Sequence, residues 1–308
     1  MFNFILFVLL VVINVNAKEP ILPIPLENNF NEEKARLGMA LFSDPILSKD
    51  NSTACISCHN IYEGGADRRI VSLGYANKKG NIQSPTVLNA KYNFKQFWNG
   101  RANNLIEQAD GPINNPAEHN MDAKTVEDRI NKSQIYKENF KKAYGVTYIP
   151  YKLVLAAIVE FENALTTPNA KFDKFLRNEI ELSPDEKEGY KLFKQYGCVT
   201  CHNGVNIGGN SFQKMGTFLE YKSDIRYPDR SKITNNDEHI NVFKVPTLRN
   251  INLTPPYFHD GSAKTLKEAI TKMSRHNLGV KFSDKQADKI ILFLKTLDGE
   301  KPKILDSK

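Results

Sequence analysis

Two short motifs that use all four cysteines of the chain constrain its fold and chemistry more than any other feature. In each, two cysteines separated by two residues are followed directly by a histidine. Thiols at this spacing can reach both vinyl groups of a haem, and the adjacent imidazole then binds the iron. One such motif alone could be a redox pair or half of a zinc site, but two copies with no spare cysteine predict two covalent haem c groups. The residues are Cys55, Cys58 and His59, and Cys198, Cys201 and His202.

The first seventeen residues have the pattern of an export signal. Residues 4–15 form an apolar run shorter than the about 20 residues of a membrane span, and a small-residue cleavage pattern ends at Ala17. An uncleaved membrane anchor is the alternative. We predict a cleaved signal peptide over residues 1–17 and a periplasmic location for the mature chain.

The sequence around each motif is repeated. Residues 33–42 and 185–193 precede the motifs, contain G-x-x-L-F and have the spacing of amphipathic helices. A strongly apolar helical pattern follows each motif, at residues 154–165 and 283–297. A helix before and a packing helix after a haem motif, found twice, predict a mostly α protein with two cytochrome c-like haem domains in tandem.

The helical pattern is interrupted between residues 166 and 183 by prolines and polar residues. We therefore predict an N-terminal haem domain at 18–170 and a C-terminal haem domain at 171–308. The 42 Lys and Arg against 35 Asp and Glu give a net charge of +7 that is scattered along the chain. Scattered charge predicts a solvated surface and no nucleic-acid partner.

The two haems are expected to differ on the side opposite the motif histidine. Met273 lies just before the C-terminal helix, where we expect a loop that brings its thioether over the second haem; Met215 is the alternative. A thioether ligand raises the reduction potential. No methionine holds the equivalent place before the helix at 154–165. This difference predicts chemistry at the first haem and electron supply through the second.

Further segments resemble the bacterial di-haem cytochrome c peroxidases in order and spacing over about residues 27–299. They are SPTVLN (84–89), QFWNGR (96–101), QADGP (108–112), PTLRN (246–250), PYFHDG (256–261) and Met273 followed by LG (278–279). The resemblance implies reduction of hydrogen peroxide to water at the N-terminal haem. It also implies that a small soluble cytochrome c or cupredoxin delivers single electrons to the C-terminal His/Met haem, and that the protein is a homodimer.

The resemblance also assigns roles to single residues. Glu118 corresponds to the acid–base on the distal side, which peroxide chemistry needs because a proton must move from one oxygen to the leaving oxygen. Gln108 matches a polar residue that hydrogen-bonds peroxide or water. Trp98, the only tryptophan of the chain, matches a residue between the haems. His259 matches a loop histidine near the second haem, with a structural or redox-coupling role.

A calcium ion between the domains is a further implication of the resemblance. Thr254 and Pro256 match positions that offer backbone carbonyl oxygens, which suit a hard cation. The third family ligand is usually Asn, and Gln83 stands in its place. The longer amide still offers an oxygen, but its reach differs.

One position departs from the family pattern. Many members carry a histidine after the first motif that binds the first haem in the oxidised state and leaves on reduction of the second; here Tyr75 matches that position. Tyr75 binds as a phenolate, or it never binds and the first haem is open without reductive activation. A third reading has His119, next to Glu118, reach the iron.

Two other functions compete with peroxide reduction. One is a di-haem electron carrier or redox sensor without turnover, against which Glu118 and an open distal side argue. The other is oxidation of a protein partner by high-valent haem. Relatives of that kind tend to carry tyrosine on the second haem, so Met273 argues against it.

Overall fold

The computed structural model describes residues 19–223 and 227–306, so the predicted signal peptide lies outside the described residues. The described chain is mostly helical, as predicted, with one antiparallel pair of short strands, β1 (Phe212–Lys214) and β2 (Val242–Lys244). The helices are α1 (Glu32–Ser43), α2 (Leu105–Asn114), α3 (Ala123–Lys132), α4 (Gln134–Tyr144), α5 (Tyr151–Ala164), α6 (Lys171–Leu176), α7 (Pro184–Gln195), α8 (Ser231–Thr234), α9 (Leu266–Asn277) and α10 (Asp284–Lys295).

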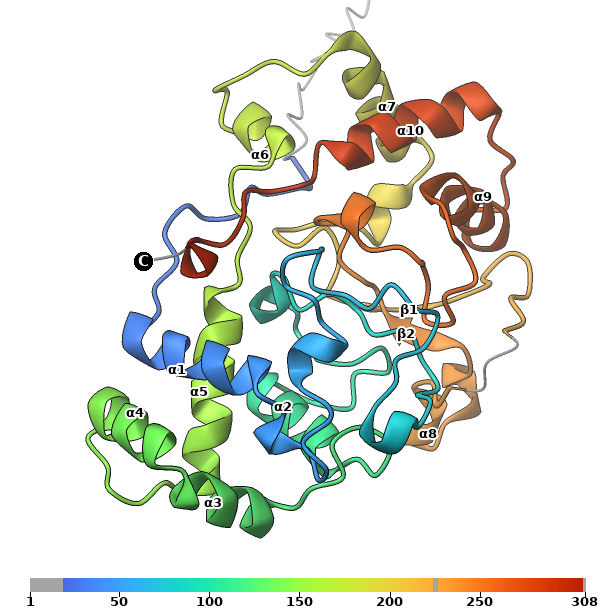
Figure 1. The fold of residues 1–308 in the computed structure, drawn as a ribbon. Coiled ribbons are helices and arrows are strands. Elements are labelled where there is room, and N and C mark those ends of the chain that lie inside the picture. The colour runs from blue at the N-terminus through green and yellow to red at the C-terminus, as the bar shows by residue number, and fades with distance from the viewer. Residues whose placement is uncertain (1–18, 224–226, 307–308) are drawn as a thin grey trace, which may run out of the picture.

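Each half of the chain is built on a pair of packed helices, α1 with α5 and α7 with α10 (Figure 1). At each contact a glycine lets the backbones approach. A Cβ added at Gly38 would lie 1.9 Å from the Ala157 carbonyl oxygen. A Cβ added at Gly189 would lie 2.0 Å from the Lys289 carbonyl oxygen. These glycines begin the G-x-x-L-F repeat, so the repeat marks the helix contact in both halves.

Local capping signals explain where the second pair begins. Ser183 caps α7 in a capping box with Glu186, and Pro184 occupies the first helical position. Ser283 and Gln286 form the same box at α10. The helices predicted before and after each haem motif are therefore confirmed.

The halves share a second repeated unit, a loop at 96–102 or 257–263. A bridge joins the two ends of each loop. Phe97 and Phe258 hold corresponding places and both adopt a positive φ, of 66° and 71°. Each loop leads into a helix, α2 in the first half and α9 in the second. The two haem motifs are thus embedded in one structural frame used twice.

The repeat corrects the expectation for Met273. Met273 lies inside α9, not on a loop, because Thr265 caps this helix and it extends to Asn277. Leu266, Ile270 and Met273 fall on one face of the helix. Met273 is the eighth residue of α9, and the eighth residue of α2 is Pro112.

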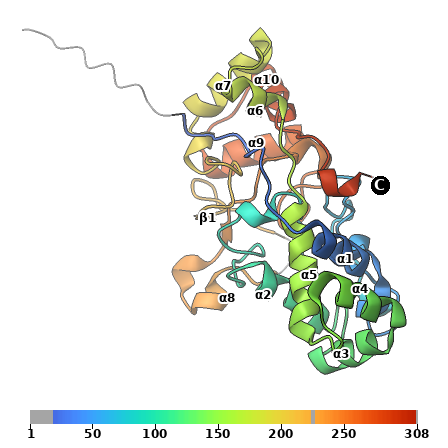
Figure 2. The same ribbon diagram turned by 90° about the vertical axis from the view of Figure 1, so that its left-hand side faces the viewer.

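The two ends of the described chain cross between the halves. Near the first end, Ile21 pairs with Gly204 and belongs to the core of the second half. Near the other end, a turn over Lys303–Leu305 places Ile304 and Leu305 in the core of the first half. Figure 2 shows the blue segment starting beside α7 before it reaches α1, and the red C-terminal turn lying near α1.

Buried polar contacts also join the halves. The Thr167 hydroxyl accepts hydrogen bonds from Asn89 at 2.7 Å and from Asn250 at 2.9 Å. Just after this junction, Asp173 forms a fully buried ion pair with Arg249 at 2.5 Å, a contact within the second half. The predicted division at residues 170 and 171 therefore falls within a tightly connected region.

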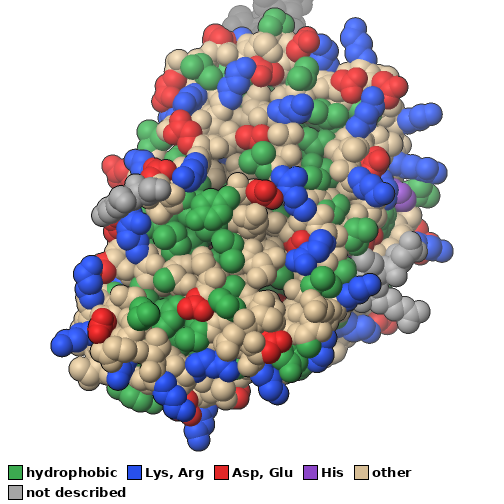
Figure 3. Space-filling view, viewed as in Figure 1, with side chains coloured by type: hydrophobic (Ala, Val, Ile, Leu, Met, Phe, Trp, Pro, Cys, Tyr) green, Lys and Arg blue, Asp and Glu red, His purple; other side chains and the backbone are tan. Residues whose placement is uncertain are grey.

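The surface carries mixed charge. Figure 3 shows Lys and Arg side chains spread over one face and interspersed with Asp and Glu. Within residues 19–223 and 227–306, no helix is long and apolar enough to cross a membrane.

Candidate haem and catalytic site

One continuous cavity of about 1140 Å³ lies between the two cores, and residues of both cysteine motifs line it. It is larger than the about 300–1,000 Å³ of an ordinary ligand pocket. Every cysteine and histidine of the two motifs lies on its wall. The size and the lining fit two covalent haem groups held in a shared space.

The two motif histidines have the same geometry. His59 Nδ1 lies 3.3 Å from the Gly65 carbonyl oxygen, and His202 Nδ1 lies 3.3 Å from the Ile207 carbonyl oxygen. A proton on Nδ1 donated to the carbonyl leaves Nε2 free to bind iron. Burial lowers the pKa of both imidazoles, that of His202 to about 4, so both are neutral and able to act as ligands.

The second half contributes two thioether side chains to the cavity wall. Met273 of α9 and Met215 both line the cavity. They belong to one apolar cluster with the buried rings of Tyr221 and Phe243. The corresponding place in the first half holds Pro112 on α2, which offers no ligand atom in its side chain.

Glu118 and Gln108 meet on the wall of the first haem position. Gln108 lies on α2 and Glu118 in the turn that follows it, and both line the cavity. Burial raises the pKa of the Glu118 carboxyl, while Asn115 and Arg101 act in the opposite direction. Asn115 Nδ2 donates to Glu118 Oε1 at 2.5 Å. This is a carboxyl group on the cavity wall that Asn115 holds in place and whose pKa desolvation raises.

Arg101 and Tyr227 both act electrostatically on or with Glu118, and the sequence assigns neither of them a role. The Arg101 guanidinium carbon lies 3.3 Å from the centre of the Phe97 ring, and Arg101 Nη1 donates to the Tyr227 hydroxyl at 3.2 Å. All three side chains line the cavity. Arg101 and Phe97 lie in a segment that supports the family resemblance, whereas nothing in the sequence near Tyr227 indicates a site.

Trp98 and His259 meet between the two halves. They occupy corresponding places in the repeated loops, and their rings pack edge to face with centroids 6.2 Å apart. Trp98 Nε1 donates to the Gln83 carbonyl oxygen at 2.9 Å. The His259 ring stacks on Phe243 at 4.2 Å, and burial lowers its pKa. This aromatic contact lies on the wall shared by both haem positions.

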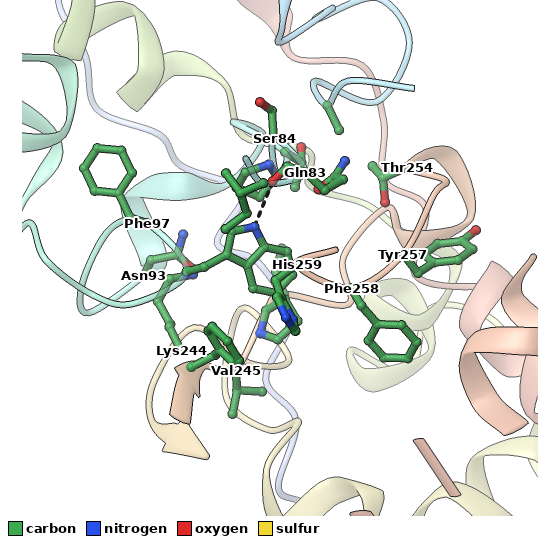
Figure 4. Close-up of a pocket in the computed structure, with 18 of the residues that line it drawn as sticks. Gln83, Ser84, Asn93, Phe97, Lys244, Val245, Thr254, Tyr257, Phe258 and His259 are labelled. Atoms are coloured by element: carbon green, nitrogen blue, oxygen red, sulfur yellow. Dashed lines mark hydrogen bonds between the residues drawn. The ribbon is translucent and has the colours of Figure 1, made fainter. Parts of the chain in front are cut away.

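The three residues matched to a calcium site also border the cavity. Gln83, labelled near Thr254 in Figure 4, donates from Nε2 to the Asp67 carbonyl oxygen at 3.0 Å, which leaves its amide oxygen available. In the described part of the chain, no hydrogen bond reaches the carbonyl oxygens of Thr254 and Pro256. The described residues contain no group of three or more His, Cys, Asp or Glu that could hold a metal. These neutral oxygens fit a hard cation that completes its shell with water.

Neither candidate for capping the first haem faces the cavity. The Tyr75 ring lies under the ammonium groups of Lys49 and Lys78, at 6.0 and 5.3 Å from its centre. His119 is buried, with Nδ1 3.1 Å from the Leu47 carbonyl oxygen. Neither side chain is among the residues that line the cavity.

Two buried charged residues on the cavity wall have no place in the sequence argument. Burial lowers the pKa of Lys244 to about 8, and its backbone nitrogen donates to the Trp98 carbonyl oxygen at 2.7 Å. Glu162 of α5 is also buried. Glu162 could have been noticed, since it follows Phe161 on the apolar face of a predicted helix; Lys244 carries no such signal.

Comparisons with known proteins agree with this geometry. A family model described as di-haem cytochrome c peroxidase matches residues 32–181, and one described as cytochrome c matches residues 186–298. The cytochrome c551 peroxidase of Nitrosomonas europaea is 47% identical over 287 residues, covering 93% of this chain and 86% of the relative. The chain belongs to the bacterial di-haem cytochrome c peroxidase family.

A further relative and a solved structure are also similar to this chain over most of its length. The cytochrome c peroxidase Ccp of Escherichia coli is 38% identical, over 92% of this chain and 62% of that relative. A crystal structure of a MauG-like protein associated with microbial copper homeostasis superposes with a TM-score of 0.81 at 26% identity, over 96% of this chain and 97% of the other. Membership confirms the predicted family, the two cytochrome c-like domains and an enzyme of the cytochrome c peroxidase type.

Proposed function

We propose that this protein reduces hydrogen peroxide to water at the N-terminal haem, with electrons that pass through the C-terminal His/Met haem. The observation that carries the proposal is the half-buried carboxyl of Glu118, which lines the cavity and whose pKa desolvation raises. A haem attached to Cys55 and Cys58 and bound by His59 would supply the redox chemistry for peroxide reduction. Met215 and Met273 of the second half line the same cavity and belong to one apolar cluster, which supports a different role for the second haem.

Proton movement is the part that the chain itself performs. Glu118 as a carboxylate takes a proton from one peroxide oxygen, and as the acid it returns the proton to the oxygen that leaves. Asn115 holds the carboxyl in place through its hydrogen bond. Gln108, on the same wall, is positioned to orient peroxide or water.

Electron supply belongs to the second half. We propose Met273 as the distal ligand there, because its thioether faces the cavity at the place where the first half has Pro112. A Met ligand raises the potential, which suits a haem that receives electrons from a soluble protein. Trp98 and His259 connect the two haem positions. The donor proposed is a small soluble cytochrome c or cupredoxin.

We propose that the first haem is open in the oxidised protein. Tyr75 and His119 both lie off the cavity wall, and each has other partners in the fold. Absorption and EPR spectra of the oxidised and half-reduced holoprotein test this directly. A high-spin signal in the oxidised form with immediate peroxide reaction is expected; an all-low-spin form that reacts only after one electron enters would require a ligand to leave.

The remaining proposals concern the whole molecule. Gln83, Thr254 and Pro256 are proposed to hold one calcium ion, which supports the contact between the halves. The relatives are bacterial peroxidases, which supports a periplasmic location after removal of residues 1–17. Homodimerisation is proposed from the family resemblance.

The deciding experiment is peroxide-dependent oxidation of a reduced small cytochrome c by the purified holoprotein. Steady turnover is expected. Absence of turnover from both the oxidised and the half-reduced protein would favour an electron carrier or redox sensor. Oxidation of a partner protein by peroxide, without oxidation of the cytochrome, would favour an enzyme that oxidises a protein partner through its haem.

A further inference from the structure

A buried acid on α5 has no partner in the fold. Glu162 is 3% exposed, and its Oε2 makes no hydrogen bond in the described chain. Its side chain lines the cavity together with Ile158, one turn earlier on the same helix. An unpartnered polar atom in an apolar interior destabilises a fold, so this position calls for an explanation.

The second half shows that packing does not require an acid here. The helix contacts at Gly38 and Gly189 make Phe161 of α5 correspond to Phe293 of α10, since each lies against its glycine. The next residue along each helix is Glu162 or Leu294, and both line the cavity. The same frame therefore places a carboxyl beside the first haem position and a leucine beside the second.

Position and charge tie Glu162 to the first haem motif. Its charge raises the pKa of Cys55, second only to the effect of burial on that thiol. Burial alone raises the pKa of Glu162 itself, to about 8. Glu118 is the other acid that acts on Cys55 from this cavity.

Most charged groups on the elements packed against α5 are engaged elsewhere, and burial is the only influence on the pKa of Glu162 in the described chain. At α1, Arg36 forms an ion pair with Glu32, and Glu33 forms one with Lys142. On α2, Glu107 accepts a hydrogen bond from Asn103 and Asp110 accepts one from Tyr151. On α3, Glu127 accepts from the Tyr151 backbone and Arg129 donates to the Ser48 carbonyl oxygen, while Lys91 donates to Asn28. A positive charge that would hold Glu162 ionised must therefore come from the cavity.

We propose that Glu162 is the proton-binding site that accompanies electron uptake at the first haem. An electron from the donor removes one positive charge from the cavity, and the Glu162 carboxylate then takes one proton from solvent. On reoxidation the carboxyl returns that proton, and its negative charge again compensates the added positive charge. The inference rests on the proposed peroxidatic role of the first haem, but its test does not require turnover.

The test is a redox titration of both haems in the holoprotein at pH values below and above 8, the pKa region of Glu162. The potential of the first haem is expected to fall as pH rises. The limit is about 59 mV for each tenfold fall in proton activity, for one proton and one electron. The second haem, beside Leu294, is an internal reference expected to depend less on pH.

Three variants separate the alternatives. In Glu162→Gln, the reduction potential of the first haem is expected to depend less on pH. Glu162→Leu, which places the residue of the second half at this position, is expected to reduce the pH dependence by the same amount. Glu160→Gln on the same helix is the matched control, because Glu160 accepts from the Asn31 backbone and does not line the cavity. An unchanged pH dependence in both Glu162 variants would overturn the proposal and assign the effect to another group such as Glu118.

Infrared difference spectra of reduction provide a second measurement. A protonated carboxyl band is expected to grow on reduction of the wild type and to be missing in Glu162→Gln. If the holoprotein shows this band but does not turn over peroxide, Glu162 is still the proton-binding site, and only the proposed peroxidase function is contradicted.

Discussion

The two halves of the molecule share one frame and differ in a few side chains on the cavity wall. Both have a glycine helix contact, a haem motif with the same histidine geometry and a loop that leads into a cavity-lining helix. The first half then places Glu118 and Glu162 on the wall, whereas the second places Met273 and Leu294 there. The shared frame brings both haem motifs to one cavity, and the proposed division of labour between the haems depends on these few side chains.

The largest expected effect comes from removing the acid that only the first half has. Glu118→Gln keeps the size and loses the transferable proton, so kcat/KM for peroxide is expected to fall about 10²–10⁴-fold. Stopped-flow reaction with peroxide measures this. Glu138→Gln, in an exposed position on α4, is the control and is expected to keep full activity. A Glu118→Gln enzyme with wild-type kinetics would remove the basis for assigning chemistry to the first half.

The second prediction makes the second half resemble the first. Met273→Leu removes the thioether, so the potential of the second haem is expected to fall by a sizeable part of the about 0.8 V range that axial ligands span. A second high-spin EPR signal should appear in the oxidised protein. Met215→Leu is the matched control, because Met215 lies in the same cluster. If Met215→Leu, and not Met273→Leu, lowered the potential and produced the new high-spin signal, Met215 would be the ligand.

The third prediction tests the frame itself. Gly189→Ala places a Cβ against the Lys289 carbonyl and Gly38→Ala against that of Ala157, so each is expected to lower the free energy of unfolding by about 1–3 kcal/mol. Denaturant unfolding measures both. Gly80→Ala is the control, because its nearest neighbour would lie 3.4 Å away, and a change within about 0.5 kcal/mol is expected. Tolerance at one glycine but not the other would mean that the halves are less alike than their geometry indicates.

The smallest expected effect concerns pH. Glu118 accepts the first proton as a carboxylate, so kcat/KM falls as pH drops below its pKa, which burial raises above 4.5. Asn115 stabilises the carboxylate and thereby lowers this pKa. In Asn115→Ala the pKa rises, and the acid limb of the pH profile should move upward by about 1 unit. Asn114→Ala, whose amide bonds to Asp110, should leave the limb in place.

Much of the frame could be predicted from the sequence, because its signals are local. The haem motifs, the G-x-x-L-F helices and the Ser183 cap each depend on residues close together in the chain. The expected loop at Met273 is wrong although the signal for α9 is also local, since Thr265 is followed three residues later by Glu268 at the start of that helix.

The rest of the site depends on contacts between distant segments. Tyr227 meets Arg101 across the two halves, and Lys244 is buried only because the cavity wall forms around it. The absence of Tyr75 and His119 from the cavity wall is likewise a property of the folded loops. The roles of the predicted site residues stay predictions until the variants above are measured.

The crossing of the chain ends has a consequence for the order in which the protein can be completed. The core of the first half contains Ile304 and Leu305, which are among the last described residues to be synthesised. A chain that stops before residue 303 keeps the whole first haem motif and its helices, yet leaves that core open. The first half of the sequence is therefore finished as a folded unit only when nearly all of the second half has been made.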